Sequence, residues 1–172
     1  GAVILLQFAP KKEYFQTWQT TQMEDRLCYY KEGIAGTISV PQTLDGEKVL
    51  SINGATSGGV SPGDVEVHTL EGYLPYLFAA NARNALLIGL GTGITANCLV
   101  HSELDHVDCV EICPEVIQAA EMALGYENNH VVKSEKFTSI IEDGRSFLQI
   151  TDKKYDIITS SGIHPRLSPN IY

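Results

Sequence analysis

The sequence lacks the features that would place it in several broad functional classes. Its 172 residues contain 12 lysines and arginines against 21 aspartates and glutamates, a formal net charge of −9, so we expect no nucleic-acid-binding surface. There are four cysteines, and the two that lie four apart, Cys109 and Cys113, have no nearby histidine or cysteine to complete a zinc set. We expect reduced, mostly buried thiols in a cytoplasmic protein and no metal site.

The sequence also lacks an apolar run of the roughly 20 residues that a membrane-spanning helix needs. Gly1–Pro10 (GAVILLQFAP) is too short and has no basic start of the kind found in signal peptides. It is interpreted either as a core strand or as the end of a membrane helix that begins earlier in a parent chain. The chain stops at Tyr172, just after the expected fourth strand of a sheet, whereas parallel sheets usually have more strands. We therefore expect a longer parent and a sheet that is truncated at the C-terminus.

The most informative stretch that is present is Ala85–Thr95, ALLIGLGTGIT. Its apolar run ends at Gly89, Gly91 and Gly93, and a helical pattern follows. This is typical of a buried strand that turns tightly into a helix, where glycines let the backbone approach a ligand and the helix start offers free N–H groups. Glu111 ends a second apolar run 18 residues later, where a carboxylate can accept hydrogen bonds from both ribose hydroxyls of a nucleoside. Together they predict a Rossmann-like domain that holds an adenosine-containing small molecule.

A small antiparallel β-sheet is expected over residues 26–60, after an N-terminal segment of residues 1–25. Its expected strands are Arg26–Tyr30, Gly36–Val40 and Lys48–Ile52, with an Asp-Gly turn before the last of them. Asn53–Gly63 is interpreted as a loop rich in glycine and serine.

A helix is expected over Asp64–Ala80, at the start of the α/β part that spans residues 61–172. Asp64 is its expected cap, and Pro75 is expected to interrupt it or start a second short helix. One face carries apolar residues at helical spacing: Val67, Leu70, Leu74, Leu77 and Phe78.

The rest of the chain alternates between strands and helices. The expected strands are Ala85–Gly89, His106–Glu111, Phe137–Glu142 and Tyr155–Ser160, and the expected helices are Ile94–His101, Pro114–Leu124 and Arg145–Ile150. Such alternation predicts an α/β fold with parallel strands joined by right-handed crossovers.

Ligands of open α/β sheets bind beyond the carboxyl ends of the strands, and further candidate residues lie there. Asp143 can accept a hydrogen bond from the exocyclic amine of adenine, beside Gly144, and Ile112 can pack against the base. Each candidate also has a structural interpretation. Glu111 can cap a helix, Asp143-Gly144 can be a turn before a capped helix, and the glycines can form a turn without a ligand. The joint spacing favours the ligand.

The glycine pattern bears on which ligand is bound. A dinucleotide site usually shows Gly-x-Gly-x-x-Gly around a pyrophosphate, whereas here Ala96 stands three residues after Gly93. Alanine is sometimes tolerated at that place, so an NAD-dependent oxidoreductase stays open as a weaker alternative. S-adenosylmethionine, which has no phosphate, fits better.

From about Arg26 onward the chain resembles the spermidine synthase family of polyamine aminopropyltransferases. The resemblance rests on a Gly63-Asp64-Val65-Glu66 stretch before a helix with Leu74-Pro75, then on LLIGLGTG, VDCVEICPEVIQAA, IIEDGRSFL and YDIITSSGIHP in this order. It implies a Rossmann-like S-adenosylmethionine-dependent transferase fold and a homodimer. The branch that it resembles most carries this domain after a bundle of membrane helices, which would make this the cytoplasmic domain of a membrane protein.

Family members transfer an aminopropyl group from decarboxylated S-adenosylmethionine to an amine, and three acidic positions usually serve this reaction. At the matching positions this chain has Thr92, Ser161 and His164. Loss of the carboxylate at Thr92 removes an ammonium partner and a repulsion against a substrate carboxylate, so intact S-adenosylmethionine could be accepted. Ser161 without an adjacent base is a poor proton acceptor, and His164 is a candidate base or an ordinary loop histidine.

Asp64 and His68 are the candidate residues on the substrate side, although a helix-start role explains Asp64 equally well. Two hypotheses of different class follow. The first is a transferase, aminopropyltransferase-like or methyltransferase-like, with an amine or another small molecule as acceptor and S-adenosylmethionine or its decarboxylated form as the second substrate. The second is a catalytically inactive domain that binds an adenosyl ligand, such as a sensor module of a membrane protein.

Overall fold

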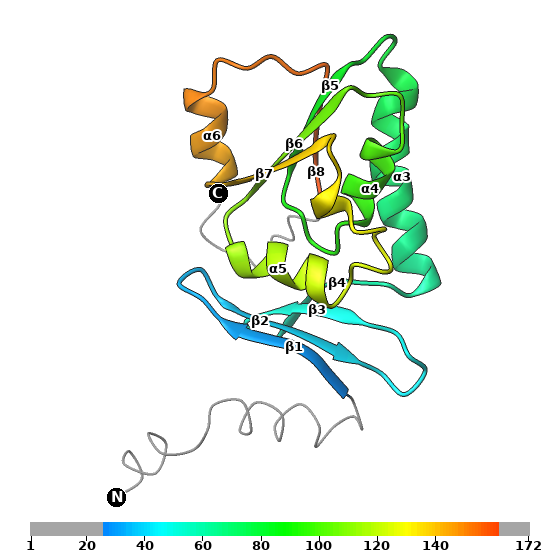
Figure 1. Cartoon of the computed structure of the whole chain (residues 1–172), viewed down its shortest axis with the longest axis vertical. Helices are drawn as coiled ribbons and strands as arrows, with labels where there is room; N and C mark the ends of the chain where they lie inside the picture. The colour runs from blue at the N-terminus through cyan, green and yellow to red at the C-terminus, as the bar shows by residue number, and fades with distance from the viewer. Residues whose placement is uncertain (1–25, 162–172) are drawn as a thin grey trace, which may run out of the picture.

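The computed structural model describes residues 26–161, which form two four-stranded sheets (Figure 1). The first sheet is antiparallel with the order β1-β2-β3-β4, and the second is parallel with the order β7-β6-β5-β8. The expectations for Gly1–Pro10 and His164 fall outside the described residues. Within residues 26–161, no helix combines the length and the apolarity needed to cross a membrane.

The antiparallel sheet contains one strand more than expected. Its strands are β1 (Arg26–Glu32), β2 (Thr37–Gln42), β3 (Val49–Ile52) and β4 (Ala55–Gly59). The interpretation of residues 53–63 as a loop was wrong, because Asn53 and Gly54 form a tight turn with φ of 53° and 79° that folds β4 back onto β3. Asn-Gly is the usual sequence of such two-residue hairpin turns, since both positions need a positive φ.

Helix α3 (Pro62–Phe78) differs from the prediction at its start and at its proline. Its cap is Ser61, whose Oγ accepts a hydrogen bond from the Asp64 backbone N–H at 3.3 Å, so the prediction of Asp64 as the cap was wrong. Asp64 instead accepts a hydrogen bond from the Ser61 hydroxyl at 2.6 Å. The helix also continues through Pro75. Only one intrahelical bond is lost there, and the Ala79 N–H still bonds to the Pro75 carbonyl.

The face that α3 buries is not its apolar face. Gly72 is its buried residue, and a Cβ placed on it would lie 2.6 Å from Cβ of Cys98, so the missing side chain lets α3 approach α4 closely. The apolar residues of the expected face are 43–86% exposed: Val67, Leu70, Leu74, Leu77 and Phe78. Periodicity identified the stripe, but residues 26–161 cover it only in part.

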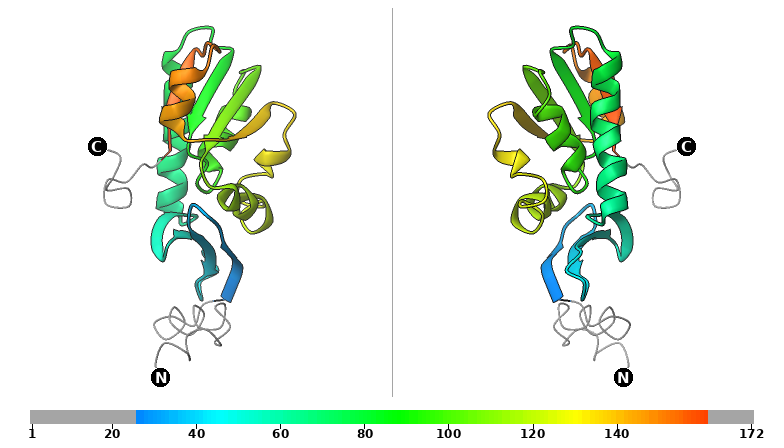
Figure 2. Two further views of the ribbon diagram at one scale, coloured as in Figure 1. Left: turned by 90° about the vertical axis from the view of Figure 1, so that its left-hand side faces the viewer. Right: turned by 90° about the vertical axis from the view of Figure 1, so that its right-hand side faces the viewer.

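The α/β part has the predicted order of elements. They are β5 (Asn84–Ile88), α4 (Ile94–Val100), β6 (His106–Glu111), α5 (Pro114–Met122), the 3₁₀ turn η1 (Val131–Lys133), β7 (Phe137–Ile141), α6 (Gly144–Ile150) and β8 (Ile157–Ser160). Helices α3 and α4 lie on one face of the sheet and α6 on the other (Figures 1 and 2). The connection from β5 through α4 to β6 and the connection from β7 through α6 to β8 cross the sheet in opposite directions. Because both crossovers are right-handed, their helices lie on opposite faces. The predicted fold class is confirmed.

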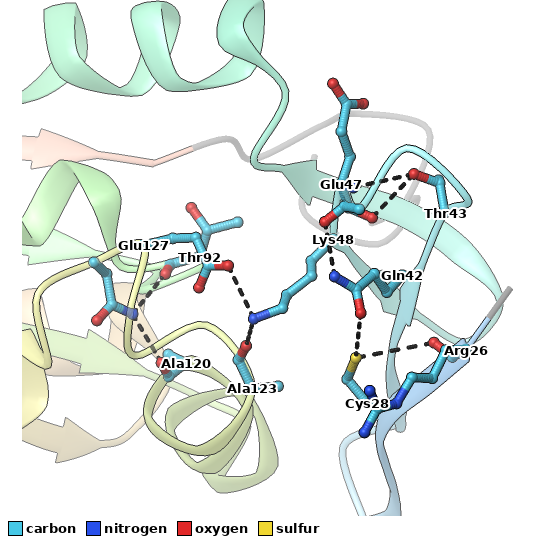
Figure 3. A network of polar contacts seen from close by, with 12 residues as sticks. Arg26, Cys28, Gln42, Thr43, Glu47, Lys48, Thr92, Ala120, Ala123 and Glu127 are labelled. Atoms are coloured by element: carbon cyan, nitrogen blue, oxygen red, sulfur yellow. Dashed lines mark hydrogen bonds and ion pairs between the residues drawn. The ribbon is translucent and has the colours of Figure 1, made fainter.

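The antiparallel sheet is attached to the α/β part by polar contacts (Figure 3). Lys48, just before β3, donates from Nζ to the carbonyl of Ala123 at 2.7 Å and forms an ion pair with Glu127 at 2.9 Å. Both side chains of this pair are about one-fifth exposed. On β1, the Tyr29 hydroxyl donates to Gln118 of α5. These polar contacts lie beside an apolar core that the two parts share, and together they hold the small sheet against α5.

The four cysteines are free thiols, and three of them are buried: Cys98, Cys109 and Cys113. Burial raises the pKa of the Cys109 thiol, and together with the hydrogen bond to Glu115 it raises the pKa of Cys113 to about 11. These two thiols are therefore protonated at neutral pH and act as packing groups.

A buried carboxylate joins β6 to the segment after α6. Asp108, whose side chain is 2% exposed, accepts hydrogen bonds from Lys153 Nζ and from the Tyr155 hydroxyl, both at 2.7 Å. His106 Nε2 lies 3.3 Å from its other oxygen. Burial alone would raise the pKa of Asp108, but these hydrogen bonds outweigh it and hold the pKa below its ordinary value.

The substitution Asp108→Asn is expected to lower the free energy of unfolding at pH 7 by about 1–3 kcal/mol, because it leaves buried polar groups incompletely paired. A depressed pKa stabilises the fold above the unfolded-state pKa of about 3.9, and this contribution is lost as the pH falls through the folded-state value. The difference between wild type and variant should therefore shrink below about pH 4. Urea unfolding at several pH values measures both effects.

The matched control is Asp105→Asn, which removes a carboxylate from an exposed ion pair with Arg83. Such surface pairs are worth about 0–1 kcal/mol, so this variant should stay close to wild type. Equal stability losses in the two variants would contradict the role assigned to Asp108.

Candidate functional site

The loop between β5 and α4 has the tight turn that its glycines predict. Gly89, Gly91 and Gly93 have φ of 81°, 55° and 85°, a region that other residues rarely adopt. The Gly89 N–H bonds to the Val110 carbonyl of β6 at 2.8 Å, and the Gly93 N–H bonds back to Leu90 at 3.0 Å. The glycines are therefore required by the backbone itself, whether or not a ligand is bound.

Glu111, at the end of β6, points its carboxylate at this glycine loop. One oxygen accepts the Leu90 N–H at 2.9 Å and the other accepts the Cys113 N–H at 2.9 Å. The residue is 8% exposed, and burial raises the pKa of Glu111 although the backbone N–H groups act against that rise. The predicted position beside the loop is confirmed. Cys113 is the cap residue of α5, so the same carboxylate also bonds to the start of that helix.

Asp143 and Gly144 stand at the end of the next strand along the sheet. Asp143 caps α6, because its Oδ1 accepts the Ser146 N–H at 2.8 Å, and this hydrogen bond lowers the pKa of Asp143. A Cβ placed on Gly144 would lie 2.6 Å from Ile88 Cγ2, so glycine lets α6 begin against β5. The cap is thus present, and contact with adenine stays a prediction for Asp143. Ile112 is 56% exposed beside these residues and stays a prediction for packing against the base.

Thr92 lies in the glycine loop and Ser161 lies next to it; that they stand where the family has carboxylates stays a prediction. Thr92 is 3% exposed, and its methyl group packs against Gly58 of β4. Ser161 follows β8 and donates its N–H to the Ile88 carbonyl at 3.0 Å. Its Oγ lies 3.8 Å from a Cβ placed on Gly91. The structure therefore brings these two positions together at the carboxyl ends of the parallel strands. His164 lies outside the described residues.

The two substrate-side candidates lie differently. Asp64 is engaged at the start of α3, where it bonds to Ser61 and packs against Gly59. His68 and Thr92 both approach Gly58, since a Cβ placed there would lie 3.6 Å from His68 Nε2 and 3.3 Å from Thr92 Cγ2. The small sheet therefore contributes a wall of the candidate site through β4.

Asn128 lies after α5 and bonds to the glycine loop, although the sequence analysis did not single it out. It is fully buried, and its Nδ2 donates to the carbonyls of Thr92 at 2.9 Å and of Ala120 at 2.8 Å. A Cβ placed on Gly93 would lie 2.7 Å from the same Nδ2. No local pattern marks Asn128, because it sits in a polar connection and meets the loop only in the folded chain.

Comparison with known proteins relates this arrangement to enzymes of polyamine chemistry. A polyamine aminopropyltransferase of Methanocaldococcus jannaschii is 31% identical over 140 residues, which cover 81% of this chain and 47% of that protein. One from Buchnera aphidicola subsp. Schizaphis graminum is 23% identical over 142 residues, which cover 82% of this chain and 49% of that protein. The chain thus spans about half the length of these curated relatives.

The fold is also found in solved structures. A spermidine synthase in complex with the transition-state analogue AdoDATO is similar with a TM-score of 0.73 at 20% identity, covering 81% of this chain and 47% of that one. Residues 65–170 match the family model described as the spermine/spermidine synthase domain. That segment holds the glycine loop, Glu111, Asp143 and Ser161, and it makes up more than half of the chain, which therefore belongs to the spermine/spermidine synthase family.

Proposed function

We propose that this chain is an aminopropyltransferase-like domain that binds decarboxylated or intact S-adenosylmethionine at the glycine loop and transfers a group to an amine. The observation that carries the proposal is the Glu111 carboxylate, which lies against Leu90 of that loop and is held by two backbone N–H groups. A carboxylate so placed can accept further hydrogen bonds from ribose hydroxyls, because each of its oxygens has two lone pairs.

The residues around Glu111 supply the rest of a nucleoside site. The glycine loop allows close approach of the backbone, and Ile112 offers an exposed apolar surface for a base. Asp143 uses Oδ1 for its own helix, which leaves Oδ2 as an acceptor for an exocyclic amine. We infer that these residues bind the adenosyl group, and that the bound sulfonium supplies the electrophilic carbon for the transfer.

The acceptor is inferred from the family, whose curated members named above are polyamine aminopropyltransferases. The chain's net charge of −9 suits a cationic amine, although most of that charge belongs to an ordinary acidic surface. Homodimer formation, a cytoplasmic location and fusion to membrane helices stay predictions. The last of these rests on Gly1–Pro10, outside the described residues.

Two uncharged residues near the glycine loop support alternatives to aminopropyl transfer. Thr92 lacks the charge that would repel a substrate carboxylate, which supports intact S-adenosylmethionine and a methyltransferase-like reaction. Ser161 lacks the basicity of a carboxylate, which supports a catalytically inactive binding or sensor domain. Turnover separates them. Release of methylthioadenosine with an amine supports aminopropyl transfer, and release of S-adenosylhomocysteine supports methyl transfer. Binding without either product supports the inactive domain.

The substitution Glu111→Gln is expected to weaken binding of decarboxylated S-adenosylmethionine about 10- to 100-fold. A hydrogen bond to a charged group is worth about 1.5–3 kcal/mol, and each 1.4 kcal/mol changes affinity tenfold. Burial raises the pKa of Glu111, so this carboxylate should become protonated at a higher pH than an ordinary glutamate. As the pH is lowered, the affinity of the wild type should therefore begin to fall at that higher pH. Isothermal titration calorimetry measures both effects.

The control for this measurement is Glu103→Gln. Glu103 is an exposed carboxylate just before β6, at the opposite ends of the strands from the candidate site. It should leave the dissociation constant unchanged. Wild-type affinity in Glu111→Gln would remove the main support for the proposed function, and thermal unfolding of both variants checks that the fold is kept.

The substitution Thr92→Asp is expected to shift ligand preference toward the decarboxylated compound. A carboxylate at this place attracts an ammonium group and repels the carboxylate of intact S-adenosylmethionine, so the ratio of the two dissociation constants should change about tenfold or more, equivalent to about 1.4 kcal/mol. Thr92→Asn has the same shape without the charge and should leave the ratio near that of wild type. A marked preference of the wild type for the decarboxylated compound would contradict this interpretation of Thr92.

A further inference from the structure

A polar cluster joins α3 to α4 beside the candidate site. His68 Nδ1 lies 3.0 Å from Glu71 Oε2, and the same oxygen accepts from the Thr95 hydroxyl at 3.2 Å. Thr95 also lies 3.2 Å from the His68 carbonyl oxygen. The side chains of His68 and Glu71 are 13% and 30% exposed, and Thr95 is buried. The close contact of the two helices at Gly72 brings these groups together.

The hydrogen bond to Glu71 determines where the imidazole carries its proton. An ionised carboxylate only accepts hydrogen bonds, so Nδ1 of His68 must be the donor. In the neutral ring the remaining lone pair is then on Nε2. Among residues 26–161, Nε2 has no hydrogen-bond partner, and it lies beside Gly58 on the side of the Thr92 methyl group. The basic nitrogen of His68 and the methyl group of Thr92 in the glycine loop therefore approach the same point on β4.

We propose that His68, positioned by Glu71, is the proton acceptor for the attacking amine in this chain. The inference rests on the proposed function, since it assigns a catalytic residue to that site. His68 takes a role that Ser161 cannot fill, because a serine without an adjacent base does not accept a proton at neutral pH. Glu71 is a positioning residue, which acts on the substrate only through the imidazole.

The proposed step transfers one proton and one carbon group. The acceptor ammonium R–NH₃⁺ gives a proton to Nε2, which yields the free amine and an imidazolium stabilised by Glu71. The amine lone pair then forms a bond to the carbon next to the sulfonium. The electrons of the breaking C–S bond stay on sulfur, which leaves as a neutral thioether, and the imidazolium later releases its proton to water.

The positioning role is tested by nitrogen-15 NMR of the histidine rings in the full chain, with His68→Gln to assign the signal. In the wild type we expect the proton of neutral His68 on Nδ1. Glu71→Gln keeps an oxygen acceptor and should preserve this tautomer. Glu71→Met, of similar length, cannot accept and should lose it. Glu135→Gln, an exposed carboxylate before β7, is the control.

The catalytic role is tested with putrescine and decarboxylated S-adenosylmethionine, by the release of methylthioadenosine. His68→Gln is expected to lower kcat by roughly 100-fold or more with little change in KM, as removal of a general base does. Glu71→Met should lower kcat less, and Glu71→Gln should recover part of the loss. Addition of putrescine to the chain saturated with methylthioadenosine should shift the Nε2 signal of His68 without turnover.

The outcomes separate this proposal from the proposed function. If calorimetry detects no binding of any adenosyl compound, the proposed function fails, whatever the state of His68. The proposal on His68 is overturned if the nucleoside binds but the neutral ring carries its proton on Nε2, or if the Nε2 signal does not respond to the amine. Wild-type kcat in His68→Gln would overturn it as well.

Discussion

The site depends on one buried carboxylate that ties two strand ends together. Glu111 leaves β6 and accepts the N–H of Leu90 from the glycine loop and that of Cys113 from the start of α5. A buried charge without partners would be costly, so these two bonds both hold the loop and keep the carboxylate in place. Asn128 supports the loop from its other side by bonding to Thr92. The loop is therefore formed before any ligand arrives, which reduces the ordering cost of binding.

In the proposed reaction, proton transfer takes place on α3. At the glycine loop Thr92 and Ser161 carry no charge, and the Glu111 carboxylate beside them is already engaged with two backbone N–H groups. The basic and acidic groups stand instead on α3, as His68 and Glu71. This arrangement is physically possible because Gly72 lets α3 lie close enough to α4 for Thr95 to share the Glu71 oxygen.

The antiparallel sheet borders the candidate site through β4. Strand β4 brings Gly58 between Thr92 and His68, and the contacts of Lys48 with Ala123 and Glu127 hold the sheet in that position (Figure 3). A larger residue at Gly58 would press on both side chains. The width of the site on this side is therefore set by contacts outside the parallel sheet.

The sequence alone determined the α/β class, the order of strands and helices within the α/β part, and the place of Glu111 beside the glycine loop. These follow from local patterns, since apolar periodicity, glycines with positive φ and residues at strand ends need no distant partner to be recognised. Only the tertiary structure decided which face α3 buries, that β4 lies beside the glycine loop at Gly58, and that Asn128 meets Thr92. The contact of Asn128 with Thr92 joins residues 36 apart through packing, and no single stretch of sequence encodes which side chains will then be neighbours.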